Sequence, residues 1–458
     1  MTRRWTWTVL ILSAFWIFYN TLFSETILYF DSFGYERLGR ILCTGHFNEY
    51  LASGPTREPL YPLFICFNMK LEDFFHIPYT NLILLTQGII LLLTQGGMAW
   101  IFQRIGLGDK VSAILILYFV ISPAILRSSL IVYSEIITYP LILLACVVSC
   151  ETWRHLTQPS AFVGKETKRA IYMGMAFLPL MFVKAVTEVI VPAFLFIFTL
   201  TLALRWKKDL GKVKKAIIFG FIAYGVFLTP VVIYKSINKI CNGNFAFTSR
   251  GSWALYGTTA RRILPTTPQE KLAQKLYVFP DKSFCAQWAG VEACEHWHYA
   301  LSDRLGMEKN AELNRQGLSM EEANRRLIQL SLGLMRQHPF ETMKGMFWEG
   351  AKLLFWEYPS WGMVVLPREI RKVYEWPWAQ GFFLFGINGL NLLFFLAAMR
   401  YAFVTKDESS VVYLWVMLLF FLLYIIAHSF FFLNERNALP IIPLYLLLIG
   451  AVIKTVQR

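Results

Sequence analysis

Long apolar stretches recur along most of the 458-residue chain, separated by polar connections. A helix needs about 20 apolar residues to cross the ~30 Å hydrocarbon core of a bilayer, and shorter stretches suffice where the helix is buried or the bilayer thins. The pattern therefore predicts an all-α polytopic membrane protein with about ten transmembrane helices, or up to twelve if further segments enter the bilayer. The predicted spans are 5–23, 80–103, 111–126, 134–152, 171–186, 187–205, 216–235, 379–400, 411–432 and 438–454.

Two connections are much longer than the others and divide the chain. The first, 24–79, contains the apolar stretch 59–71, which is too short to span a bilayer and predicts a helix along the membrane interface. The second is 236–378. We therefore expect a transmembrane region over 1–235 that includes the first long loop, a polar segment over 236–378, and C-terminal transmembrane helices over 379–458.

Segment 236–378 is the one region with the composition of an ordinary soluble domain, and we expect it to be small and α-helical. Within it, Ser319 and Glu322 form an S-x-x-E capping box, which predicts the start of a helix. Pro339 ends that helix. The next stretch, 340–356, mixes apolar and charged residues and predicts a second interfacial, amphipathic helix.

The distribution of basic residues predicts which side of the membrane each connection faces. Alternate connections carry 18 basic residues, whereas the short connections of the other set carry about one each (Arg127, Lys184 and Arg436). By the positive-inside rule the first set is cytoplasmic, which places both termini in the cytoplasm and both long segments outside. The cytoplasmic set comprises Arg3, Arg4, Arg104, Lys110, Arg154, Lys165, Lys168, Arg169, Arg205, Lys207, Lys208, Lys212, Lys214, Lys215, Arg400, Lys406, Lys454 and Arg458.

Composition supports the membrane assignment. The chain is 56% hydrophobic and only 16% charged, whereas soluble domains carry roughly 25% charged residues. A net charge of +14 could indicate nucleic acid, but the basic residues cluster at the ends of apolar stretches, and we expect no nucleic-acid partner. The first stretch resembles a signal peptide, yet it is long and aromatic and has no small-x-small motif before Glu25. It predicts an uncleaved anchor.

The seven cysteines are too few for a disulfide scaffold. Cys146 and Cys150 fall within a predicted apolar helix, where we expect them to pack as small hydrophobic residues. Cys285 and Cys294 lie in the long polar segment. A disulfide between them is one interpretation if that face is oxidising, and an unpaired polar loop is the other.

Charged residues in or at the membrane are costly, so they are candidates for functional residues. Here the candidates share the side of the two long segments, which favours one shared site over scattered structural pairs. Lys184 and Glu188 lie four residues apart and would share a helical face if their turn is helical. The candidates are Asp31, Glu36, Arg57, Glu58, Arg127, Glu135, Lys184, Glu188, His428, Glu435 and Arg436.

Four motifs on this side resemble, in order and spacing, those of the GT-C superfamily of membrane glycosyltransferases. The resemblance covers most of the chain and is greatest to bacterial relatives of the protein O-mannosyltransferases and of the aminoarabinose-to-lipid A transferases. None of the motifs is specific alone. They are Asp31-Ser-Phe-Gly-Tyr35-Glu36, Arg57-Glu58-Pro59-Leu60-Tyr61-Pro62, Tyr133-Ser134-Glu135 and Glu435-Arg436-x-x-Leu-Pro440-x-x-Pro443.

The resemblance implies a GT-C-like bundle in the bacterial inner membrane that transfers a sugar, with inversion, from a polyprenyl-phosphate donor to an acceptor hydroxyl outside. Such chemistry needs a carboxylate to deprotonate the acceptor and cations to bind the departing phosphate. Asp31 matches the family's catalytic acid in the first loop and is the expected base; a helix N-cap is its structural alternative. Many relatives carry a second acidic residue directly after the first. Glu36 departs from this spacing, so we assign it, with Tyr35 and Glu58, an auxiliary role.

Arg57 is the first candidate for the donor phosphate, because a guanidinium binds phosphate oxygens through two parallel hydrogen bonds. The lipid A transferases tend to place the basic residue directly before the proline, where this chain has Glu58, so the match is closer to the broader family. Further phosphate-binding candidates are Tyr61, Lys184, Arg250, Arg261, Arg262 and Arg436, with solvated arginines as the alternative for the latter four arginines. Glu135, Glu188, His428 and Glu435 are expected to line the site.

Other functions are less favoured by the sequence. Cys294-Glu295-His296-Trp297-His298 offers zinc-like ligands without a second cluster, so we expect no metal site and no certain cofactor, although a divalent cation stays possible. Walker, dinucleotide-binding and nucleophile-elbow motifs are absent from the sequence. A transporter or flippase, which would place charges near the midplane of repeated halves, and a polysaccharide polymerase or ligase are the alternatives. The sugar and the acceptor, whether protein, lipid A or glycan, stay open.

Overall fold

The fold is described from a computed structural model of the chain. It describes residues 3–28, 31–52, 57–157, 166–248, 250–264, 267–358, 364–404, 408–431 and 435–456. Of the basic residues used to predict topology, Lys165, Lys406 and Arg458 lie outside these ranges, as does the side chain of Glu435.

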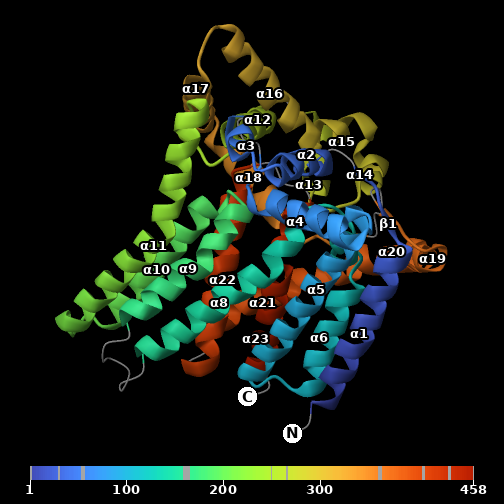
Figure 1. Cartoon of the computed structure of the whole chain (residues 1–458), viewed down its shortest axis with the longest axis vertical. Helices are drawn as coiled ribbons and strands as arrows, with labels where there is room; N and C mark the ends of the chain where they lie inside the picture. Colours follow the sequence, from blue (N-terminus) through green and yellow to red (C-terminus); the bar gives the residue numbers. More distant parts are fainter. Residues whose placement is uncertain are drawn as a thin grey trace.

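Long apolar helices form a bundle that makes up the lower part of the molecule in Figure 1. Eight helices in the described ranges are long and apolar enough to cross a membrane, or nine if the bent pair α6–α7 is one span. The chain is therefore an all-α polytopic membrane protein, as predicted. The eight are α1 (Arg4–Phe23), α5 (Tyr79–Arg104), α8 (Glu135–Thr157), α10 (Thr187–Arg205), α11 (Leu210–Asn242), α20 (Pro377–Gly381) continued by η1 (Phe382–Ile387) and α21 (Asn388–Val404), α22 (Glu408–Ser429), and η2 (Glu435–Ile441) continued by α23 (Ile442–Val456).

Two of the ten predicted spans differ from a single apolar helix. The span 111–126 is broken into α6 (Asp109–Ile121) and α7 (Pro123–Leu130), which meet at 53°. Pro123 has no backbone N–H for the preceding turn, and the Ser122 hydroxyl instead accepts a hydrogen bond from the Ile125 N–H. The span 171–186 corresponds to α9 (Glu166–Val183), whose first turn is charged.

Both chain ends lie at the same end of the bundle. The Asp109 carboxylate at the start of α6 accepts hydrogen bonds from the backbone N–H groups of Trp5 (2.9 Å) and Thr6 (3.1 Å) at the start of α1. Near the end of α23, Lys454 lies against the α5–α6 turn at Gly106. Figure 1 shows the two long polar segments at the opposite end.

The first long segment folds into short helices over the end of the bundle. They are α2 (Asp31–Cys43), α3 (Phe47–Ala52) and α4 (Leu60–Phe75). Figure 1 shows α4 running across the direction of the spanning helices. A disulfide between Cys43 and Cys66 joins α2 to α4.

The second long segment is also helical. It comprises α12 (Gly251–Ile263), α13 (Pro268–Leu276), α14 (Lys282–Ala289), α15 (Val291–Trp297), α16 (Tyr299–Arg315), α17 (Met320–Gln337), α18 (Pro339–Lys352) and α19 (Arg368–Glu375). Ser319 and Glu322 form the predicted capping box of α17, and Cys285 and Cys294 form a disulfide. A short antiparallel pairing of β1 (Glu25–Thr26) with β2 (Val364–Val365) ties the two segments together.

The helices α12 and α16 approach each other more closely than side chains would allow. A Cβ atom on Gly257 would overlap the carbonyl oxygen of Ser302, and one on Gly306 would overlap that of Trp253. Glycine is required at both positions because it alone lacks a Cβ. The position of α16 is therefore fixed by backbone contact with α12.

Candidate functional site

Five charged side chains form a continuous series of ion pairs at the end of the bundle that carries the polar segments. Asp31 accepts hydrogen bonds from Arg57 and, through Oδ2, from Arg436 Nη1 at 2.8 Å. The Oε1 atom of Glu135 accepts from Arg436 Nε and from Lys184 Nζ, each at 2.7 Å. We call Asp31, Arg57, Glu135, Lys184 and Arg436 the ionic cluster. It contains three cations and two carboxylates and so carries a net positive charge.

Helix ends bring these residues together. Asp31 and Glu135 are the first residues of α2 and α8, where the helix dipole favours a negative charge. Lys184 follows the last residue of α9, where the dipole favours a positive charge. Arg436 comes from η2, and Arg57 lies in the short connection before α4, which begins at Leu60. The charges thus meet because the elements that bear them end at the same level of the bundle.

The cluster is buried at one side and reachable at the other. The Glu135 side chain is 2% exposed, so its charge is stable there only because two cations face it. Asp31 and Arg436 are 25% and 23% exposed. A ligand can therefore reach the Asp31–Arg436 pair, whereas Glu135 supports it from beneath.

Aromatic rings hold the two guanidinium groups in place. The Arg57 guanidinium lies over the Tyr35 ring at 5.2 Å, and that of Arg436 lies over the Tyr133 ring at 3.9 Å. The Tyr35 hydroxyl is 3.1 Å from the Ser134 hydroxyl. Cation–π contacts of this kind add to the ion pairs and limit the motion of the arginines.

The arginines keep Asp31 ionised. Burial alone raises the pKa of the Asp31 carboxyl, but the charges of Arg436 and Arg57 outweigh burial and hold the pKa below its usual value. While both arginines face it, Asp31 is a weak proton acceptor. An anion that drew the arginines away would raise the pKa of this carboxyl and make it a better base.

Two further predicted residues border the cluster. The Glu58 carboxylate accepts a hydrogen bond from the Ala185 N–H at 2.7 Å, next to Lys184 in the chain. Tyr61 is fully buried against Tyr35, with 4.9 Å between ring centroids, and its hydroxyl donates to Gln87 at 2.9 Å. Tyr61 therefore supports Tyr35 and does not reach the cluster as a phosphate ligand.

Glu36 and Glu188 have partners outside the ionic cluster. Glu36 pairs with Arg40 at 2.7 Å on the outer face of α2, and Glu188 pairs with Lys235 at 2.6 Å. The chain between α9 and α10 is not a continuous helix, so the condition under which Lys184 and Glu188 would share a helical face is not met. Lys184 turns to Glu135 instead.

Arg250 and His428, two further predicted residues, have contacts outside the ionic cluster. Arg250 lies over the Trp253 ring at 5.4 Å. The ring of His428 is buried in α22, with Nδ1 3.0 Å from the Tyr424 carbonyl oxygen. Glu435 is not described beyond its backbone.

Arg261 and Arg262 are not exposed to solvent and do not belong to the ionic cluster. Both side chains are fully buried and pair with Glu349 of α18. Arg261 also donates to the Trp297 carbonyl at 2.6 Å, and Arg262 donates to the Ser429 carbonyl at the end of α22. These contacts anchor the outer helices to the bundle.

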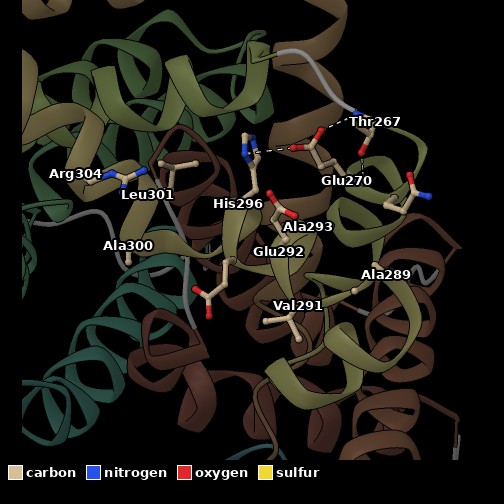
Figure 2. A pocket seen from close by; sticks show the side chains of 13 residues that line it. Thr267, Glu270, Ala289, Val291, Glu292, Ala293, His296, Ala300, Leu301 and Arg304 are labelled. Carbon is tan, nitrogen blue, oxygen red and sulfur yellow. Dashed lines mark hydrogen bonds and ion pairs between the residues drawn. The ribbon is translucent and has the colours of Figure 1, made fainter.

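Two residues of the motif Cys294–His298 have partners of their own in the structure. Cys294 is in a disulfide, and His296 Nδ1 lies 3.3 Å from Glu270 Oε1. Across the described ranges, no three His, Cys, Asp or Glu side chains gather as a candidate metal site. His296 instead lines a pocket of about 860 Å³ among α13, α15 and α16, and Figure 2 shows its ring facing the Glu270 carboxylate.

Sequence reasoning missed one carboxyl beside the cluster, Asp303 of α16. Burial, and next the charge of Asp31, raise the pKa of Asp303 to about 6, while Arg57 opposes the shift. In the part of the chain that the structure describes, its Oδ1 is buried without a hydrogen-bond partner. No sequence signal marked Asp303, because it lies within a uniformly polar helix far from any predicted span.

The ionic cluster offers two chemical capabilities. Its excess positive charge can bind an anion, and Asp31 can accept a proton once that anion occupies the arginines. Comparisons with protein-family models, curated proteins and solved structures give no match for the chain.

Proposed function

We propose that the protein is a membrane glycosyltransferase that moves a sugar from a polyprenyl-phosphate donor to an acceptor hydroxyl at the outer face of the membrane. The observation that carries the proposal is the joining of Asp31 to Arg57 and Arg436 at one end of an apolar bundle. A donor of this class has one phosphate between its sugar and its apolar chain. It requires cations where an apolar surface ends, and a carboxylate beside them.

The two arginines suit the donor phosphate. Both face the same carboxylate, so an anion of similar size that replaces Asp31 would meet both guanidinium groups. Hydrogen bonds between charged groups contribute about 1.5–3 kcal/mol each. Lys184 adds positive charge through its shared contact with Glu135.

Asp31 is the base in this proposal. The phosphate takes over Arg57 and Arg436, and the pKa of Asp31 rises as their charges are neutralised. The acceptor hydroxyl gives its proton to Asp31 while its oxygen bonds to the anomeric carbon. The bond from that carbon to the phosphate oxygen breaks, its electron pair leaves with the polyprenyl phosphate, and the configuration is inverted.

Two observations support an outer site with cytoplasmic termini. The basic connections lie at the end of the bundle that holds both chain termini, and the long polar segments lie at the opposite end. This arrangement agrees with the positive-inside rule. The disulfides Cys43–Cys66 and Cys285–Cys294 are in those polar segments, and disulfides persist on oxidising faces. We propose ten spans, with α9 and the bent α6–α7 pair each crossing once, in the inner membrane of a bacterium.

Turnover of the donor tests the proposal. The purified full chain in lipid nanodiscs is supplied with a panel of radiolabelled polyprenyl-phosphate sugars, and label that leaves the lipid is counted. We expect wild type to consume a donor and Asp31→Asn to be slower by roughly 10²–10⁴-fold, the usual contribution of a positioned base. Glu36→Gln is the matched control, because Glu36 lies on the same helix and pairs with Arg40.

Two results would count against the proposal. If Asp31→Asn consumes the donor at the wild-type rate, Asp31 is not the base. Failure of wild type to consume any donor in the panel, with the protein folded, would reject the glycosyltransferase assignment. Movement of the intact donor across the membrane without loss of sugar would instead identify a flippase.

A further inference from the structure

One turn of α16 carries both residues that line the pocket in Figure 2 and a carboxyl on which the ionic cluster acts. Ala300, Leu301 and Arg304 line the pocket, and the charges of Asp31 and Arg57 act on Asp303 of the same turn. With 3.6 residues per turn, Asp303 lies about 60° around the helix from Ala300. The wall of the pocket and the carboxyl on which the charges of the cluster act therefore belong to one helical turn.

The position of this turn is rigid. Backbone contacts at Gly257 and Gly306 fix α16 against α12. At the end of α12, Arg262 binds Glu349 of α18 and the Ser429 carbonyl of α22. These buried contacts connect α16 to the spanning helices, so the pocket keeps its place relative to the cluster.

Asp303 lacks a donor for a buried oxygen. Buried polar atoms almost always have a hydrogen-bond partner, and an exception calls for an explanation. Within the described ranges, Asp303 Oδ1 is such an exception. A ligand hydroxyl that reached the edge of the pocket would supply the missing donor.

The lining of the pocket favours a particular ligand chemistry. Three carboxylates (Glu270, Glu292 and Glu295) and one arginine (Arg304) line it, and Glu270 and Glu295 already face His296 and Lys282. The lining therefore has no excess of positive charge, which disfavours a phosphate or sulfate group. Carboxylates accept hydrogen bonds from several hydroxyls at once. The neighbouring apolar side chains, such as Val291, can contact the C–H faces of a sugar ring. A volume of about 860 Å³ lies within the usual range for small-ligand sites.

We infer that this pocket and Asp303 form the acceptor site, and that the acceptor is an uncharged carbohydrate chain. The inference rests on the proposed transfer at the ionic cluster and names its second substrate. The pocket holds the sugar units, Asp303 accepts a hydrogen bond from a hydroxyl of the terminal unit, and this contact directs the acceptor toward Asp31. A protein or a phosphate-bearing lipid would lack the match to this lining.

Two substitutions test the site separately from the donor chemistry. Val291→Trp narrows the pocket and, because Val291 is 66% exposed, leaves the core intact. Asp303→Asn removes the negative charge of the carboxylate that is proposed to accept a hydrogen bond from the sugar. Glu308→Gln is the matched control, since Glu308 is an exposed carboxylate of the same helix. The assay compares slow donor hydrolysis by water with transfer of label to short neutral oligosaccharides, to a phosphorylated oligosaccharide, to lipid A and to an unfolded protein.

The expected result is a change in acceptor affinity alone. Val291→Trp and Asp303→Asn should each raise the KM for the neutral oligosaccharide about tenfold, as expected when a contact worth about 1.4 kcal/mol is lost. Donor hydrolysis by Val291→Trp should stay at the wild-type rate, which also shows that this variant is folded. Unchanged KM values in both variants would overturn the inference.

Other outcomes separate this inference from the proposed function. If wild type consumes the donor but labels only lipid A, the phosphorylated oligosaccharide or protein, the carbohydrate inference is wrong and the glycosyltransferase proposal stands. If no donor is consumed, the proposed function fails, and saturation-transfer NMR with the neutral oligosaccharides still tests the pocket. Binding that Val291→Trp abolishes would support the site, and absence of binding to wild type would overturn it.

Discussion

Replacement of Glu135 by glutamine tests whether the ionic cluster is held by charge. Glu135 is 2% exposed and accepts hydrogen bonds at 2.7 Å from both Lys184 and Arg436. Glutamine keeps the shape of the side chain and removes its charge. After the substitution, Arg436 still has its ion pair with Asp31. Among the described residues, the only ion-pair partner of Lys184 is Glu135. The substitution therefore leaves Lys184 as an uncompensated cation.

The expected loss of stability is large. Removal of one partner from a buried ion pair costs about 3–5 kcal/mol, because the other charge is left without compensation. Lys184 and Arg436 are 18% and 23% exposed, so solvent screens part of this cost. We expect Glu135→Gln to lower the free energy of unfolding by about 3 kcal/mol, the lower end of that range.

A double-mutant cycle with Lys184→Met separates the pair from other effects. Unfolding is followed in mixed micelles with increasing SDS for wild type, both single variants and the double variant. Because the double variant removes the stranded cation, its loss should be smaller than the sum of the two single losses by at least about 1 kcal/mol. Additive losses, or a Glu135→Gln variant as stable as wild type, would refute the electrostatic account of the cluster.

Three further predictions concern binding, pH and the outer segment. Arg57→Lys and Arg436→Lys should each weaken binding of a polyprenyl phosphate about tenfold, because lysine cannot form two parallel hydrogen bonds; calorimetric titration that shows unchanged affinity would contradict this role. Burial and the Asp31 charge raise the pKa of Asp303 to about 6, so the folded state binds this proton more tightly than the unfolded state and loses that stabilisation as the pH rises through about 6. The unfolding temperature should therefore be lower at pH 7.5 than at pH 5, and this difference should be smaller in Asp303→Asn than in wild type. The same pH dependence in both proteins would refute the raised pKa of Asp303. Replacement of Cys285 and Cys294 by serine should destabilise the outer helices by about 2–3 kcal/mol, as expected for a short disulfide loop; hydrogen exchange around α14 and α15 that stays at the wild-type rate would contradict it.

The membrane helices could be predicted because their signal is local. The length of an apolar stretch determines whether it can span a bilayer, and this signal identified α1, α5 and α10 to within one residue at each end. It also identified α8 and α11, but both helices extend beyond the predicted spans 134–152 and 216–235. The bend at Pro123 depends on a proline within an apolar stretch, which hydropathy alone does not register. The start of α9 shows the same limit, since its charged first turn extends the helix beyond the apolar residues.

The partners within the cluster depend on tertiary structure. Asp31 and Arg436 are 405 residues apart in the chain, so their ion pair has no local signal. What sequence could indicate was a common side, because charges at alternate helix ends lie at the same membrane face. The sequence placed all five members of the cluster on that side but could not indicate that Lys184 pairs with Glu135, because that contact depends on the broken turn before α10.

The outer segment was less predictable for a physical reason. Its helices are polar and their packing partners are distant, so a buried residue resembles an exposed one in the sequence. From the sequence, Arg261 and Arg262 are phosphate-binding candidates or solvated arginines, because Glu349, with which both pair, is 88 and 87 residues away. Asp303 is hidden in the same way, since the charges that act on it belong to Asp31 and Arg57, far away in the chain.

The most direct test of the central claim is a structure of the full chain with a polyprenyl-phosphate sugar bound. The account predicts the phosphate in contact with Arg57 and Arg436, the polyprenyl chain against the apolar bundle, and Asp31 released from both arginines beside the anomeric carbon. A phosphate bound elsewhere, with the Asp31–Arg57 and Asp31–Arg436 ion pairs intact, would contradict it.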